Sequence, residues 1–259
     1  MQVTQAIKSE NEIDSLLTNC EHKLPALLSI STGLAIFCEK LEIYLGDDVE
    51  ACSETLIPSG EIRVVEANAR MDELKRGIQL FGFSCGSPRF TLASHYFREA
   101  LYFDSTYYEH NRYTHSLITI LKCAQAIEVL FGSKYDSIRE KCRQLGIADN
   151  IIEAEIVCIN ITRNKLGPAH ASGFVPTPDE SDVLRNFANR SVKTVQQLLL
   201  HISRAEIRNH PYLLEMFERD QGKEVLIGKL RETLERPHWS IDGEAKLRHV
   251  LFTDPRLRS

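Results

Sequence analysis

The segment from Thr114 to Phe131 restricts the fold most, because its apolar residues recur at helical spacing over about five turns. A helix with a single apolar stripe has to bury that stripe against other elements, so the segment predicts a core built from several helices. Gly132 follows directly and ends the predicted helix. The stripe consists of Leu117, Ile120, Leu121, Ala124, Ile127 and Phe131, whereas His115, Thr119, Lys122 and Glu128 lie off it.

The run Thr177-Pro178-Asp179-Glu180 predicts the start of another helix. Thr177 suits the N-cap position, Pro178 suits the first helical position, and Glu180 stands where its carboxylate can reach back to the N-cap backbone. This capping box is the strongest local signal in the chain. The helix that it opens is predicted to end near Ser203.

The remaining apolar spacing predicts further helices and an all-α fold class. Residues 47–60 read as a loop, and the glycines, serines and proline of residues 82–88 read as a boundary. We therefore predict an N-terminal helical region (1–84), a helical bundle (85–205) and a C-terminal helical extension (206–259). The predicted helices span a segment from Ser9 and residues 25–45, 61–81, 89–110, 137–145, 149–166, 211–219, 223–234 and 244–252.

Two of these segments leave alternatives open. Residues 149–166 are apolar almost all round, which predicts a buried central helix. Their β-branched residues also suit a strand, but the length, Asp149 as a cap and the Gly167-Pro168 stop favour a helix. Residues 89–110 are rich in aromatic side chains, which stack on bases in some proteins, but such a helix more often packs them into a core, and we favour the core.

Composition indicates a soluble, cytoplasmic globular protein. Hydrophobic residues make up 43% of the 259 residues and charged residues 26%. The first twelve residues are polar and acidic, unlike a signal peptide, and we expect no apolar run to be long enough to span a bilayer. The seven cysteines include no Cys-x-x-Cys pair, so we expect reduced thiols, no zinc site and no cofactor.

The charge is unevenly distributed along the chain. The net charge of −5 argues against a protein that coats nucleic acid generally. Residues 1–60 hold three lysines against ten acidic residues, whereas residues 160–210 hold seven basic residues against four acidic ones. The second region is therefore locally basic. A solvated charged surface accounts for both regions, and an acidic arm that shields a basic site is the weaker alternative.

That basic region contains Arg163, Asn164 and Lys165 at the end of a predicted helix, with His170 beyond the Gly-Pro break. Arginine is a permanent planar cation suited to phosphate, and histidine titrates near neutrality, so the two together suit phosphodiester chemistry. The structural alternative is an arginine that complements the helix dipole, an ordinary Gly-Pro stop and a solvated loop histidine. Spacing alone favours this alternative.

The order of the predicted helices along the chain favours the functional interpretation of Arg163 and His170 over the structural one. A helix that contains Ser116–Phe131 is followed by a helix that ends in Arg163-Asn164, then by His170 and a capped helix, and this arrangement resembles the HEPN superfamily, most closely its Apea-like branch. The mark of the family is an arginine, a polar residue and a histidine a few positions on. The resemblance covers roughly residues 88–205 and implies a bundle of four or five helices.

The resemblance implies metal-independent cleavage of RNA to 2′,3′-cyclic phosphate and 5′-hydroxyl ends, in a defence, stress or toxin–antitoxin role. His170 would be the general acid or base, Arg163 would stabilise the transition state, and Asn164 would orient them. Lys122, Glu128 and Lys165 are candidate substrate-binding residues. The implied partners are RNA, a second copy of the chain and a regulatory protein, without a membrane.

Two alternative functions also fit the sequence. The first is a non-catalytic helical module that dimerises or binds RNA or a protein partner. The second is a small-molecule or nucleotide sensor that uses Arg163 to hold a phosphate.

Overall fold

The described residues are predominantly helical, as the apolar spacing predicts. The computed structural model describes residues 22–37, 40–45, 48–54, 75–77, 80–81, 83–84, 86–105, 112–166, 176–205, 209–215 and 221–234. The elements are α2 (Leu24–Thr32), β1 (Lys40–Leu45), β2 (Asp48–Glu54), α4 (Pro88–Ser105), α5 (Arg112–Phe131), α6 (Tyr135–Gln144), α7 (Asp149–Ile151), η3 (Ile152–Val157), α8 (Cys158–Leu166), α9 (Pro178–Ile202), η5 (Pro211–Leu213) and α10 (Gln221–Leu234).

The chain divides into two compact units, Met1–Glu215 and Met216–Ser259. The first holds every described element except α10, which belongs to the second. The sequence-based division at residues 84/85 and 205/206 stays a prediction.

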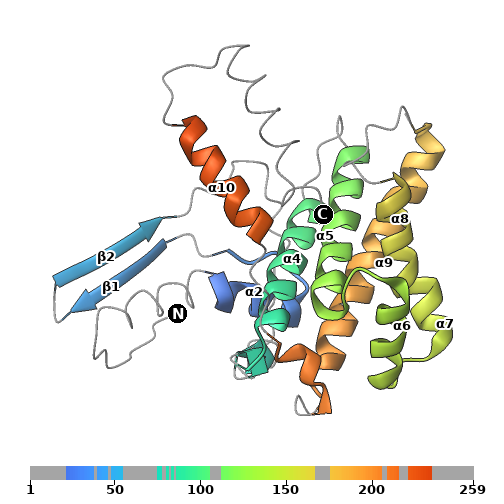
Figure 1. Cartoon of the computed structure of the whole chain (residues 1–259), viewed down its shortest axis with the longest axis horizontal. Coiled ribbons are helices and arrows are strands. Elements are labelled where there is room, and N and C mark those ends of the chain that lie inside the picture. Colours follow the sequence, from blue (N-terminus) through green and yellow to red (C-terminus); the bar gives the residue numbers. More distant parts are fainter. Residues whose placement is uncertain are drawn as a thin grey trace. The chain divides into compact units, whose positions relative to one another are not determined.

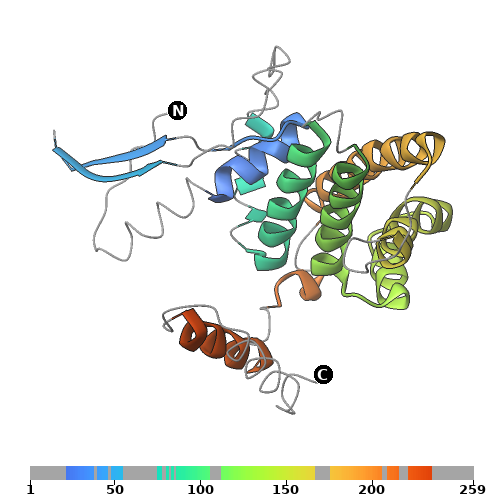
Figure 2. The ribbon, with the colours of Figure 1, turned by 90° about the horizontal axis from the view of Figure 1, so that it is seen from above.

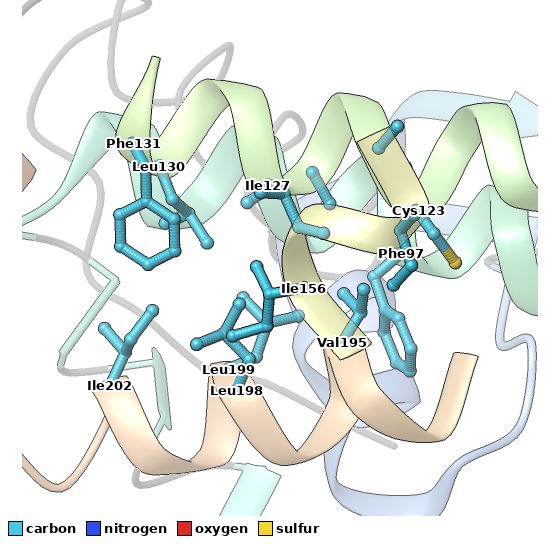
Figure 3. Packing of buried hydrophobic residues seen from close by; sticks show 14 of the residues in the cluster. Phe97, Cys123, Ile127, Leu130, Phe131, Ile156, Val195, Leu198, Leu199 and Ile202 are labelled. Atoms are coloured by element: carbon cyan, nitrogen blue, oxygen red, sulfur yellow. The ribbon is translucent and has the colours of Figure 1, made fainter. Parts of the chain in front are cut away.

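Helix α5 is the central element of the first unit, where it contacts α4, α6, α8, α9 and η5 (Figures 1 and 2). Its predicted apolar stripe is buried: Ile120, Ala124, Ile127 and Phe131 are each at most 1% exposed. Figure 3 shows side chains of α4, α5, η3 and α9 meeting in this core. The periodicity of the segment therefore predicted both the helix and the face that it buries.

By length and composition alone, Tyr113–Phe131 of α5 is also long and apolar enough to cross a membrane. The expectation that no apolar run reaches that length is wrong for this helix. However, 56% of its most apolar window is buried inside the structure. The core helix of a soluble bundle meets the same criteria.

Helix α4 places two of its aromatic residues in the core. Phe90 and Phe97 are fully buried, and the Phe90 ring stands edge-on to Phe83 with their centroids 5.0 Å apart. The core interpretation of residues 89–110 is confirmed for these two side chains. The helix ends at Ser105, and Tyr107 and Tyr108 lie outside the described residues.

Residues 25–45 do not form the single helix that the sequence predicts. Helix α2 ends at Thr32, because Gly33 adopts the left-handed conformation (φ +70°) and donates its N–H to the Ser29 carbonyl at 2.9 Å. Only glycine adopts this conformation without strain, so it is a strong helix stop. The chain then reverses: the Ser29 Oγ accepts the N–H of Ile36 at 3.0 Å.

Beyond that reversal the chain forms an antiparallel hairpin, which the all-α prediction did not include. Strand β1 pairs with β2, with Leu45 opposite Asp48 and an irregular register between Ile43 and Tyr44. Residues 48–54 are therefore a strand and not part of a loop. Ile43, Tyr44 and Val49 are β-branched or aromatic residues that suit a strand, and the pairing of the two segments makes it the stable state.

The predicted capping box of α9 is present. The Glu180 N–H donates to the Thr177 Oγ1 at 3.3 Å, and the Thr177 N–H donates to the Glu180 Oε2 at 2.7 Å. These bonds from Thr177 hold the pKa of Glu180 below its ordinary value. The motif alone thus located the helix start correctly.

Residues 149–166 form one continuous helical run, as predicted, but not a buried central one. Ile151 and Ile161 are 46% and 42% exposed, so the run lies at the side of the bundle with one face in solvent (Figure 1). Its middle, η3, is a π-helix. The prediction of all-round burial is wrong because apolar composition does not reveal which face lacks a neighbour.

The other predicted helices have mixed outcomes. Residues 75–77 and 80–81 are helical, and a Cβ at Gly77 would lie only 2.6 Å from the Leu28 Cδ2, so this stretch packs closely on α2. The predicted helix 211–219 is only the short 3₁₀ turn η5 over its described part. The predicted segments from Ser9 and over 244–252 lie outside the described residues.

Among the cysteines whose side chains the structure describes, all three are free thiols. Cys123 and Cys142 are buried and Cys158 is partly buried. Burial raises the pKa of Cys142 to about 12, which keeps it as the thiol.

We predict that Gly33→Ala lowers the free energy of unfolding by about 1–2 kcal/mol, because the new residue would be strained at positive φ. Its Cβ would also lie 3.1 Å from the Gln196 Nε2, which donates to the Ile30 carbonyl. Urea denaturation measures the loss. Gly146→Ala is the matched control: it has φ +75° but nothing within 4 Å of its Cβ. A smaller loss at Gly33 than at Gly146 would contradict the contact with Gln196.

His95 on α4 provides a pH-dependent prediction. Burial, Arg98 and His22 lower the pKa of His95 to about 4. The unfolded chain, with a pKa near 6.5, takes up this proton first, so the contribution of His95 to stability falls as the pH drops from about 6.5 to below 4. We expect the loss of about 1–2 kcal/mol, after allowing for the partial solvent access of the ring, to be absent in His95→Gln. Urea denaturation at pH 7 and pH 4.5 compares the parent chain with His95→Gln. An identical pH dependence of the free energy of unfolding in both would show that His95 is not the group responsible.

Candidate functional site

Arg163 lies in the last turn of α8 and is held by a carboxylate of α5. Its Nη1 is 3.0 Å from the Glu128 Oε1, and its Nη2 donates to the Glu128 Oε2 at 3.1 Å. The two side chains are 30% and 19% exposed. A two-point contact of this kind fixes the guanidinium plane as well as its position.

Asn164 extends this contact to α6. Its Oδ1 accepts from the Arg163 Nη1 at 2.8 Å, and its Nδ2 donates to the Tyr135 hydroxyl at 2.7 Å. A continuous polar chain therefore runs from Glu128 through Arg163 and Asn164 to Tyr135. Three elements that are separate in the sequence, α5, α6 and α8, contribute to it (Figure 1).

Tyr135 is the member of this chain that the sequence did not single out. It is the first residue of α6, three positions after Gly132 has turned the chain with φ +92°. A tyrosine at a helix start is ordinary, so no local signal marks it. Only the tertiary contact with Asn164 does so.

The electrostatics of the pair are set by partial burial. Burial raises the pKa of Glu128 above its ordinary value, and the opposing charge of Arg163 does not fully cancel this effect. Glu128 therefore releases its proton less readily than a solvated glutamate, while the positive charge of Arg163 favours the anion. An arginine fixed in this way is charged, oriented and about one-third exposed.

The other predicted substrate-binding residues have different positions. Lys122 pairs with Glu99 of α4 at 2.6 Å and lies over the Tyr96 ring, so it stabilises the contact between α4 and α5. Lys165 is exposed on α8, next to Asn164. Of the three candidates, Glu128 joins Arg163 directly and Lys122 does not. His170, the remaining predicted catalytic residue, lies outside the described residues.

The structural alternative for Arg163 is also visible in these contacts. Both ends of its guanidinium contact side chains, so the residue does more than complement the dipole of α8. A cross-link between α5 and α8 is one role that the geometry supports, and a phosphate contact through the exposed part is another. As for metal binding, the described residues include no group of three or more His, Cys, Asp or Glu side chains placed to hold an ion.

We predict that Glu128→Gln lowers the free energy of unfolding by about 1–2 kcal/mol at pH 7, because Arg163 would keep its charge without its counter-ion. Glu99→Gln is the matched control, since it also breaks one ion pair of α5 but removes a carboxylate that is 41% exposed. We expect it to cost about 0.5 kcal/mol. Equal losses in urea denaturation would show that the Arg163 pair is an ordinary surface contact.

No protein-family model, no curated protein and no solved structure matches this chain. The reasoning about its function therefore starts from the residues around Arg163 and from their geometry.

Proposed function

We propose that this chain is a metal-independent endoribonuclease of the HEPN type, with Arg163 and His170 as its catalytic residues. The observation that carries the proposal is that Arg163 is fixed by Glu128 at the end of α8, where the sequence then supplies Asn164 and, after the Gly-Pro break, His170. A fixed, partly exposed guanidinium suits the charge that builds up on a phosphate in its transition state.

The reaction would proceed by transfer within the RNA. His170 takes the proton of the 2′-hydroxyl, and the 2′-oxygen attacks the adjacent phosphorus. The bond from phosphorus to the 5′-oxygen breaks, and that oxygen receives a proton, from the same histidine or from the His170 of a second copy. The products are a 2′,3′-cyclic phosphate and a 5′-hydroxyl, so the substrate is RNA and not DNA.

The other site residues would act on Arg163. Glu128 would hold the guanidinium plane, and Asn164 would connect it to Tyr135. A twofold dimer would bring two Arg163–His170 sets to one cleft, because such an interface apposes the same patch of both copies. A ribonuclease built this way suits a defence, stress or toxin–antitoxin role.

A second candidate, the non-catalytic interaction module, is favoured by the exposed apolar side chains of the same helical run. Ile151 and Ile161 are 46% and 42% exposed, so this run offers apolar side chains that a partner could cover. In this reading the Arg163–Glu128 pair would only connect two helices, and His170 would have no chemical role.

The deciding experiment incubates the purified chain with total RNA in excess chelator and identifies the ends that form. We predict cleavage with 2′,3′-cyclic phosphate ends and a loss of at least about 100-fold for His170→Ala, the usual scale of general acid–base catalysis. Arg163→Lys keeps a cation for Glu128 but loses the planar fork, so we expect a similar loss without unfolding. The Arg163→Ala/Glu128→Gln double variant removes the charge without leaving a buried carboxylate unpaired.

Two outcomes would contradict the proposal. Equal cleavage by the parent chain and by folded His170→Ala would place the activity elsewhere or in a contaminant. No cleavage by the folded, dimeric parent chain on any RNA supplied would favour the interaction module.

A further inference from the structure

A groove on the first unit lies between the α7–η3 run and the C-terminal half of α9. It has a volume of about 600 Å³, within the range of small-molecule sites. Residues 146–148, which precede α7, also line it. Its lining does not include Arg163, Asn164 or Glu128, so it is separate from the candidate site.

The floor of the groove is apolar. Ile147, Ile151, Ile156 and Leu198 line it, and of these Ile151 is 46% exposed. A large aliphatic side chain that remains half exposed inside a concave surface favours the binding of an apolar ligand, because the ligand removes its apolar surface from water. The floor therefore suits a hydrocarbon or aromatic body.

One wall of the groove is charged, and most of that charge is internally neutralised. The Arg190 Nε donates to both Glu155 carboxylate oxygens, at 2.9 and 2.8 Å, and the Thr194 Oγ1 donates to the Glu155 Oε2 at 3.2 Å. These bonds lower the pKa of Glu155, the one from Arg190 most, and keep it ionised. The charges of Glu155 and Arg190 thus neutralise each other on the groove wall.

Lys193 is the lining cation that has no acidic partner within the lining itself. It is exposed and forms no ion pair within the part of the chain that the structure describes, although it interacts through space with Asp104 of α4. The Nε2 of His201 donates to the Leu145 carbonyl at 2.8 Å, because a carbonyl oxygen can only accept. This ring nitrogen is therefore not a hydrogen-bond acceptor for a ligand. The lining as a whole carries an excess of one positive charge, which complements a monoanion.

The backbone of the wall is also unusual. Glu155 and Ile156 belong to η3, and π-helical turns are rare and concentrate at functional sites. Here the π-helix supplies both a carboxylate that orders the wall and an aliphatic side chain of the floor.

We propose that this groove binds an amphipathic monoanion, with an apolar body on the Ile147–Ile151–Leu198 floor and an acidic head at Lys193. The inference is independent of the proposed ribonuclease activity. A carboxylate, sulfonate or phosphate diester head, each with a single negative charge, would satisfy the same cation.

Two matched fluorescent probes test the proposal: 8-anilino-1-naphthalenesulfonate and its uncharged analogue N-phenyl-1-naphthylamine, titrated into the folded full chain. We expect saturable binding of one sulfonate probe per chain, about fivefold tighter than the neutral probe, the scale of one charge pair in water. Lys193→Gln should bring the sulfonate probe to the affinity of the neutral one and leave the neutral probe unchanged. Lys134→Gln, which removes an exposed lysine outside the lining, should change neither.

A blocking variant keeps the test decisive. Ala148 is exposed at the rim, so Ala148→Trp should fold normally and abolish the binding of both probes. Four results would overturn the proposal: no saturable binding, equal affinity for both probes, an equal effect of Lys134→Gln and Lys193→Gln, or unchanged binding in Ala148→Trp. A parent dimer that Ala148→Trp dissociates would also overturn it, because a second copy would then occupy the groove.

Discussion

The burial of one face of α5 is the interaction on which the rest of the first unit depends. Its apolar stripe meets α4, α9 and η3 in a single core (Figure 3). Each large apolar side chain buried there contributes about 1.5–3 kcal/mol relative to the exposed state. Because net stability is far smaller than the sum of such terms, the position of every neighbouring helix is set by how it completes this core.

The candidate site is a consequence of that packing. Once α5 and α8 lie together, Glu128 and Arg163 are adjacent and partly shielded from water, and each becomes costly without the other. Burial raises the pKa of Glu128, and the neighbouring guanidinium opposes the rise. The same pair that connects the helices therefore also orients a partly exposed cation at the bundle surface.

The helical run 149–166 connects the two candidate sites. Its middle, η3, lines the groove, and its end carries Arg163 and Asn164. One face of the run packs against α5 and α9, while Ile151 and Ile161 stay exposed. The two sites therefore lie on one continuous helical run, although they share no residue.

Where the signal was local, the amino-acid sequence was enough to predict a helix, and for α5 also the face that it buries. The periodicity of α5, the Thr177–Glu180 box and the run 149–166 were predicted because hydrogen bonds and side-chain spacing within one segment specify them. It also predicted Arg163, Asn164 and Glu128 as site residues, although the roles of Arg163 and Asn164 came from a family resemblance. Four other features depend on contacts between segments and follow only from the tertiary structure. The hairpin of β1 and β2, the exposed face of α8, the separation of Lys122 from Arg163 and the place of Tyr135 beside Asn164 each depend on a partner distant in sequence, and no local pattern encodes that partner.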